Sequence, residues 1–167
     1  MGISPYLSSI RAKVGTALLV VPSVTGIVFD EHQRVLLVRQ RDLNIWSTPG
    51  GAIEPNETPA NAVVREVWEE TGLRTEPVRL LGVFGGPQCM VTYPNGDQVT
   101  YVTSVFECRV CSGTLRDTTE ETNASQYVDA STFAQLDLTP WAAFIVPTLL
   151  GARDTPPFEP ASWTPPD

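Results

Sequence analysis

The spacing of apolar and polar residues in the first half of the chain predicts two strands and then a helix. Val24–Phe29 and Arg34–Gln40 are rich in Val, Ile and Leu, and the four polar residues between them predict a hairpin. Thr58–Thr71 is typical of a helix, because a capping threonine and a proline begin it and a glycine follows it directly.

The second half of the chain predicts further strands and a second helix. Arg79–Phe84 and Val99–Val110 are expected to be strands, with Tyr93–Asp97 as the turn between them. A short strand is expected near Gln126–Val128, and an apolar helix at Pro140–Leu150. Together these elements predict an α/β domain.

The two ends of the chain depart from this pattern. Ser4–Val21 combines a candidate short helix with an apolar run at 17–21. From Thr155 onward, five of the last thirteen residues are prolines, which predicts an extended or disordered tail. The expected organisation is therefore an N-terminal segment at 1–23, one domain at 24–152 and a proline-rich tail at 153–167.

Composition limits the classes of partner. The chain has 167 residues, enough for one ordinary core, and 19 acidic against 11 basic residues give a net charge of −8. This charge disfavours nucleic acid and anionic membranes as partners, so a phosphate-bearing substrate would need a bound metal or a few placed arginines. The apolar run at 17–21 is too short for a signal peptide or a membrane span, and three cysteines are too few for a disulfide scaffold. We therefore expect a cytoplasmic protein.

The predicted helix at 58–71 carries a face of carboxylates. Glu66, Glu69 and Glu70 fall on one narrow arc at about 100° per residue. Like charges at this spacing repel unless a cation lies between them, and hard oxygen ligands suit Mg²⁺ or Mn²⁺. The adjoining arc is apolar and is expected to face the core; it consists of Ala60, Val63, Val64 and Val67.

These residues belong to a longer motif. From Gly51 to Leu73 the sequence matches the Nudix box, G-x5-E-x7-R-E-U-x-E-E-x-G-U with U an aliphatic residue, at every specified position. The chain therefore resembles the Nudix hydrolases over about residues 24–150. The resemblance implies a Nudix-type α/β/α sandwich with a mixed β-sheet, in which the box forms a loop, a helix and a second loop.

The resemblance also implies roles for individual residues. Glu66, Glu69 and Glu70 would bind the divalent cations, with the carbonyl oxygen of Gly50 as a further ligand. Glu57 would act from the loop, either through a metal-bound water or as a partner of a ligand. Arg65 would orient a box glutamate rather than contact the substrate.

The implied reaction is attack by a metal-activated water on one phosphorus of a nucleoside diphosphate derivative, such as ADP-ribose or a nucleotide sugar, without a covalent intermediate. Two alternatives remain open: a hydrolase that removes damaged nucleoside triphosphates, and a Nudix-fold module that binds a nucleotide without turnover. The proton acceptor is expected to be Glu66 or Glu69, or a carboxylate after the box, for which Glu120 and Glu121 are the candidates.

Several weaker signals concern substrate binding and assembly. Arg39 and Arg41 are candidates for contacting a distal phosphate, and Trp46 and Tyr93 for stacking on a base, although each could instead be an ordinary surface or packing residue. The apolar N-terminal strand could pair with a second copy in a homodimer, or fold onto its own sheet.

Overall fold

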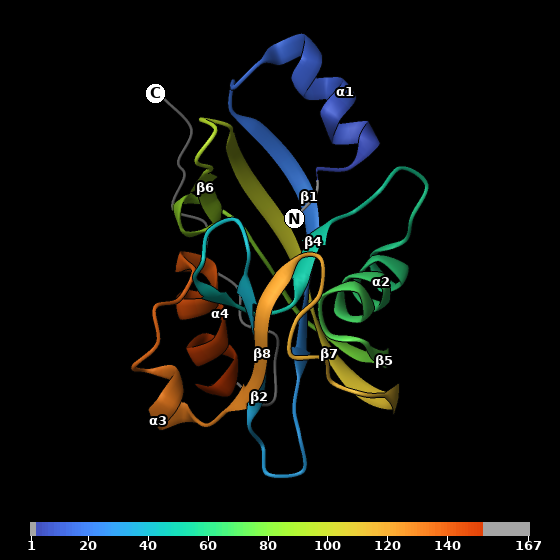
Figure 1. The fold of residues 1–167 in the computed structure, drawn as a ribbon, viewed down its shortest axis with the longest axis vertical. Helices are drawn as coiled ribbons and strands as arrows, with labels where there is room; N and C mark the ends of the chain where they lie inside the picture. Colours follow the sequence, from blue (N-terminus) through green and yellow to red (C-terminus); the bar gives the residue numbers. More distant parts are fainter. Residues whose placement is uncertain (1–2, 152–167) are drawn as a thin grey trace, which may run out of the picture.

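The computed structural model describes residues 3–151, which form two β-sheets flanked by helices (Figure 1). The first sheet has the strand order β4-β1-β7-β5, with β6 paired to β7, and the second has the order β3-β2-β8. The helices are α1 Pro5–Val14, α2 Pro59–Thr71, α3 Ala130–Phe133 and α4 Pro140–Gly151, with a short 3₁₀ turn at Pro87–Cys89. The strands are β1 Leu19–Val28, β2 Val35–Gln40, β3 Trp46–Ser47, β4 Gly50–Ala52, β5 Leu73–Phe84, β6 Met90–Thr92, β7 Gln98–Gly113 and β8 Thr122–Val128.

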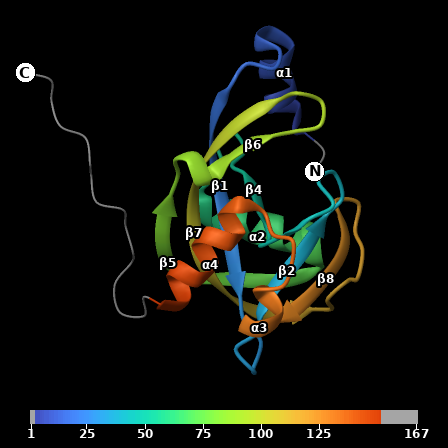
Figure 2. The same cartoon turned by 90° about the vertical axis from the view of Figure 1, so that its left-hand side faces the viewer.

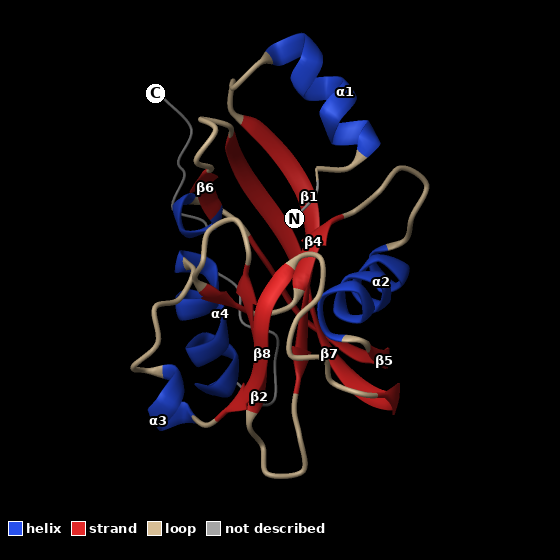
Figure 3. Cartoon of the chain, in the orientation of Figure 1, coloured by secondary structure: helices blue, strands red, loops and turns tan. Residues whose placement is uncertain are grey.

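The layers are those of an α/β/α sandwich. β1 and β7 run parallel over ten residue pairs, whereas β4, β5 and β6 join them antiparallel, so the first sheet is mixed. In Figures 1 and 3, α2 lies on one side of the strands, and α3 and α4 lie on the other. The predicted fold class is therefore confirmed.

Two apolar clusters hold the layers together. One joins α2 to the first sheet through buried residues that include Val24, Val63 and Val67. The other lies between the sheets and α4, and includes Ile27, Leu37 and Ile145. The alternation of sides along β1, with Val24 facing one cluster and Ile27 the other, explains why this strand is buried on both faces from Ser23 to Val28.

The hairpin predicted at residues 24–40 is wrong in its pairing. The turn exists, since the Asp30 N–H donates to the Arg34 carbonyl at 3.1 Å, but the two strands then diverge into different sheets. A single bridge joins Phe29 to Val35. The physical reason is burial. β1 is buried on both faces, which is typical of an inner strand with a partner on each edge, and its partners are β7 and β4. β2 pairs instead with β3 and β8.

The connection from β5 to β7 also differs from the prediction. The two strands are antiparallel neighbours, but the turn at residues 93–97 joins β6 to β7 rather than β5 to β7. β3, β4 and β6 span only two or three residues each, which is too short to produce a detectable apolar period. The predicted helices at 58–71 and 140–150 are confirmed as α2 and α4, and the candidate N-terminal helix is confirmed as α1.

The N-terminal strand folds onto its own sheet. Leu19–Val21 pairs in parallel with Val99–Tyr101 at the start of β7. Of the two arrangements expected for this segment, the structure has the intramolecular one, and self-association stays a prediction. The proline-rich tail lies outside the described residues. Between residues 3 and 151, no helix is both long and apolar enough to span a membrane.

Candidate active site

Helix α2 fixes the direction in which the carboxylates point. Thr58 caps its first turn by accepting a hydrogen bond from the Asn61 N–H at 3.2 Å, and Gly72 ends it in the left-handed conformation with φ of 75°. Val63 and Val67 are completely buried against the first sheet. With this face anchored, residues one turn apart on the neighbouring arc, Glu66 and Glu70, must also point inward.

Glu70 and Glu66 are unusually buried for carboxylates, with exposed fractions of 1% and 4%. Burial raises the pKa of Glu70 well above its usual range, and the nearby charge of Glu66 adds to the rise, while the Gly50 N–H, which donates to Glu70 Oε2 at 3.0 Å, opposes it. Burial also raises the pKa of Glu66 to about 7, although the Arg65 guanidinium lowers it in part. A cation bound nearby would therefore favour the ionised form of both carboxyl groups.

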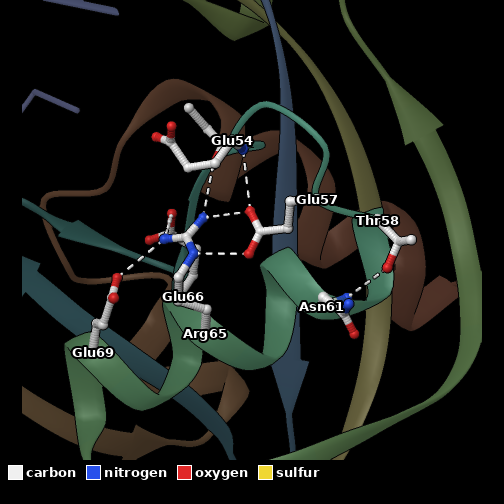
Figure 4. A network of polar contacts seen from close by, with 8 residues as sticks. Glu54, Glu57, Thr58, Asn61, Arg65, Glu66 and Glu69 are labelled. Atoms are coloured by element: carbon white, nitrogen blue, oxygen red, sulfur yellow. Dashed lines mark hydrogen bonds and ion pairs between the residues drawn. The ribbon is translucent and has the colours of Figure 1, made fainter. Parts of the chain in front are cut away.

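Arg65 is the centre of a network of polar contacts (Figure 4). Its Nε and Nη2 donate to the two oxygens of Glu57, both at 2.9 Å, which is a bidentate pair. Its Nη1 donates to Glu66 Oε1 at 2.7 Å and to Glu69 Oε2 at 3.1 Å. The hydrogen bonds from Arg65 lower the pKa of Glu57. Arg65 thus holds the carboxylates of both the loop and the helix in fixed directions.

Three carboxylates, two from α2 and one from the segment before β8, meet at one point. Oxygen atoms of Glu66, Glu70 and Glu121 lie within 4.8 Å of one another. Glu121 reaches this point because β8 begins beside the end of α2, where the Thr122 hydroxyl donates to the Glu70 carbonyl at 3.0 Å. Three carboxylates without a softer ligand among them suit a hard divalent cation such as Mg²⁺.

Glu69 has a different position from the other two helix carboxylates. Its side chain is 36% exposed, pairs with Arg65, and lies at the wall of the adjoining cavity rather than in the three-carboxylate cluster. Sequence spacing placed Glu66, Glu69 and Glu70 on one arc. Within that arc, the structure brings Glu66 and Glu70 together with Glu121 and leaves Glu69 at the rim.

The carboxylate cluster opens into a cavity of about 800 Å³. This volume is within the usual range for small-molecule sites. Tyr93 and Tyr101 line the cavity, and their hydroxyl groups are hydrogen-bonded at 2.8 Å. Burial raises the pKa of both phenols, so both are neutral at physiological pH. The other described lining residues come from residues 3–21, the box, the 93–99 region and Asp42 after β2; they include Leu7, Arg11, Leu19, Val21, Ala52 and Val99.

Four candidate residues lie away from this cavity wall. Arg41 donates through its side chain to the carbonyls of Thr119 and Glu120, at 2.8 and 3.1 Å, and so supports the loop that carries Glu121. Arg39 donates to the Asn44 carbonyl at 3.2 Å. The lining residues do not include Trp46, which packs against the core near α4, or the exposed Glu120.

Sequence reasoning missed several lining residues. Tyr101 lies within a predicted strand, but which face of that strand borders a cavity depends on the pairing of β7 with β1. Arg11 and Leu7 belong to the N-terminal segment, for which the sequence predicts a short helix and an apolar strand but no part in a site. Their position over the cavity depends on a chain reversal at residues 15–18, for which Gly15 with φ of 61° is the one local signal.

Comparison with known proteins agrees with this geometry. Residues 20–149 match the family model described as NUDIX domain. A MutT-like protein of Streptomyces ambofaciens is 39% identical over 103 residues, which are 62% of this chain and 60% of that protein. The chain spans less than two thirds of the length of the curated relatives that it matches first.

Solved structures share the arrangement of layers. A MutT protein from Methanosarcina mazei superposes with a TM-score of 0.67 at 21% identity, covering 81% of this chain and 96% of that one. An ADP-ribose pyrophosphatase from Streptococcus suis superposes with a TM-score of 0.61 at 26% identity, covering 83% of this chain and 96% of that one.

Proposed function

Because the chain belongs to the NUDIX family, we propose that it hydrolyses the diphosphate bond of a nucleoside diphosphate derivative, such as ADP-ribose or a nucleotide sugar. The proposed cofactor is Mg²⁺ or Mn²⁺. The single observation that carries the proposal is the meeting of Glu66, Glu70 and Glu121 at one end of a cavity large enough for a nucleotide.

The buried carboxylates fit a divalent cation on their own chemistry. Ionised carboxylates that share a site with little solvent are destabilised by desolvation and by one another, and both costs decrease when a cation binds between them. Glu66, Glu70 and Glu121 would hold the cation, with the Gly50 carbonyl as the further expected ligand. A bound cation supplies positive charge that offsets the phosphates and lowers the pKa of a water molecule.

The surrounding residues position the ligands. Arg65 restrains Glu66 and Glu69 by direct hydrogen bonds, and Glu57 restrains Arg65 by the bidentate pair. Loss of Glu57 would remove the bidentate pair and leave the guanidinium held only by Glu66, Glu69 and the Ala52 carbonyl. We therefore assign Glu57 and Arg65 to positioning, and place no contact between them and the substrate.

The proton acceptor is proposed to lie among Glu66, Glu69 and Glu121, because each of these side chains lines the cavity. Glu120 is not in this set, since its side chain is exposed and does not line the cavity. Single glutamine variants separate the roles. Replacing a cation ligand should raise the metal concentration needed for half-maximal rate, whereas replacing a base should lower kcat at saturating metal.

A product screen tests the proposed function. The protein with Mg²⁺ is incubated with ADP-ribose, nucleotide sugars and nucleoside triphosphates, and the products are separated by ion-exchange chromatography. We expect a nucleoside monophosphate from a diphosphate derivative, and no such product from Glu70→Gln. The matched control is Glu31→Gln, because the Glu31 side chain lies in an exposed turn and is 86% exposed. Binding of these nucleotides without turnover, with Mg²⁺ and again with Mn²⁺ in its place, would instead identify a binding module.

A further inference from the structure

Helix α1 contributes almost nothing to the core. None of its residues is buried, and Tyr6 and Val14 are 48% and 42% exposed. Its contact with the apolar clusters is Leu7, which packs at the edge of the group formed by Val21, Ala52 and Val99. Figures 1 and 2 show α1 at one end of the molecule, beyond the ends of the sheet. Core packing therefore does not explain why α1 is held in place.

A single arginine fastens α1 to the sheet. The Arg11 guanidinium donates to the carbonyls of Ala17 at 2.6 Å and Gln98 at 2.7 Å, and to that of Gly15 at 3.1 Å. Its Nε also lies 3.6 Å from a carboxylate oxygen of Asp97, and its side chain is only 10% exposed. We call this set of contacts the Arg11 clamp. It joins the helix to the start of β7.

The clamp holds α1 over the cavity. Ile3, Leu7 and Arg11 line the cavity, and so do Glu66, Glu69 and Glu121. Figure 1 shows α1 and α2 at separate places along the molecule, so we call the part of the cavity lined by α1 the α1 end and the part lined by the glutamates the carboxylate end. Only one of the two ends is formed by residues that match the family model. The carboxylate end lies within residues 20–149, which match the family, whereas α1 precedes them.

The charges at the α1 end do not suit an anion. Among the described lining residues, the cations are Arg11 and Arg65, and the guanidinium groups of both are already bound by carbonyl or carboxylate oxygens. The apolar side chains of Leu7, Leu19 and Val21 form walls there, beside the two tyrosines. An uncharged, partly aromatic group would lose little hydration on entering, whereas a second phosphorylated group would find no available cation.

We infer that the α1 end of the cavity binds the nucleoside moiety of the substrate, and that Leu7 and the Arg11 clamp determine its affinity. The inference rests on the proposed function in taking the carboxylate end as the place of the diphosphate. Leu7 contacts the nucleoside directly. Arg11 acts through the position of α1 and is therefore a positioning residue.

Hydrogen exchange of α1 tests this inference without turnover. The full chain in excess chelator is mixed with adenosine, guanosine, cytidine or uridine, and separately with ribose 5-phosphate. We expect at least one nucleoside to slow amide exchange in residues 5–14 by about threefold or more, because the helix gains a packing partner. Ribose 5-phosphate should have no such effect. Equal protection by ribose 5-phosphate, or protection by none of the four nucleosides, would overturn the inference.

Variants of Leu7 make the test specific. Leu7→Trp fills the α1 end and should weaken nucleoside binding by about tenfold or more, and Leu7→Ala should weaken it by removing a wall. The matched control is Tyr6→Ala, because Tyr6 is exposed on the same helix and does not line the cavity. Unchanged nucleoside affinity in both Leu7 variants would refute the assignment.

Kinetics with a turned-over substrate separate positioning from general damage. Arg11→Gln should raise KM by about tenfold with kcat within about twofold, and Arg11→Lys should recover part of the loss. A fall in kcat with unchanged KM contradicts the positioning role. If no substrate is hydrolysed but nucleosides still protect α1, the proposed hydrolysis fails and nucleoside binding at the α1 end stands. If hydrolysis is normal but α1 is never protected, the reverse holds.

Discussion

The buried carboxylates should make the metal-free protein less stable as the pH rises. Glu66 is the group for which the effect can be worked out, because burial raises its pKa from 4.5 to about 7. The folded form therefore holds this proton more tightly than the unfolded form. The stabilisation is fully present below the unfolded pKa and is lost as the pH rises through the folded pKa.

The size of the effect follows from the shift. A difference of one pKa unit corresponds to about 1.4 kcal/mol, so the change at Glu66 is worth about 3 kcal/mol in full. About 2 to 3 kcal/mol of this should be lost between pH 5 and pH 8. Glu70, whose pKa is also raised, contributes a loss of the same sign. The lowered pKa of Glu57 acts in the opposite sense, but at pH values below the usual carboxyl range.

Urea unfolding in excess chelator at pH 5 and pH 8 measures the change in the free energy of unfolding. We expect Glu66→Gln to lose clearly less stability over this interval than the wild type, because the glutamine does not ionise. Glu31→Gln, in the exposed turn, should behave as the wild type. Addition of Mg²⁺ at pH 8 should restore stability to the wild type. A wild-type stability that is flat or rises from pH 5 to pH 8, or an equal fall in Glu66→Gln, would show the reasoning to be wrong.

Three other predictions follow from the same geometry. Activity should vanish on chelation and return with Mg²⁺ or Mn²⁺, and Glu70→Gln should lower kcat by a factor on the order of 10² or more while the fold persists, as measured by steady-state rates and circular dichroism. Oxygen from labelled water should appear in a phosphate product within a single turnover, and a trapped covalent enzyme intermediate would exclude direct attack by water. Gly51→Ala should reduce activity, since its Cβ would lie 2.5 Å from Glu66 Oε1 and would displace that carboxylate, whereas Gly50→Ala should above all unfold at lower temperature, since its Cβ would clash with the backbone carbonyl oxygen of Val24.

The parts of the molecule that sequence predicts best are those with local causes. Helix α2 begins and ends where its capping threonine, its proline and its final glycine indicate, because each of these residues acts within one turn of the helix end. The same helix period places Glu66 and Glu70 beside the buried valines. The contact of Arg65 with Glu66 and Glu69 also lies within one helical turn.

The parts that sequence predicts poorly depend on distant pairing. A hairpin between β1 and β2 satisfies every local signal, yet the ten residue pairs between β1 and β7 bury more of β1 than a two-stranded ribbon would. Local signals cannot predict the pairing of β1 with β7, because β7 lies about eighty residues further along the chain. The short strands β3, β4 and β6 also depend on distant pairing, because each adds to a sheet that longer strands form.

The sequence identifies Glu121 as a candidate site residue but does not predict that it, rather than Glu120, joins the cluster. Glu120 and Glu121 are equivalent in sequence, since both lie in a polar loop after the box. Arg41 binds the carbonyls of this loop and the Thr122 hydroxyl binds the end of α2, and together these contacts leave Glu120 exposed and bring Glu121 to the cluster. Register along β8 therefore decides which of two adjacent carboxylates joins Glu66 and Glu70, and a shift by one residue would exchange them.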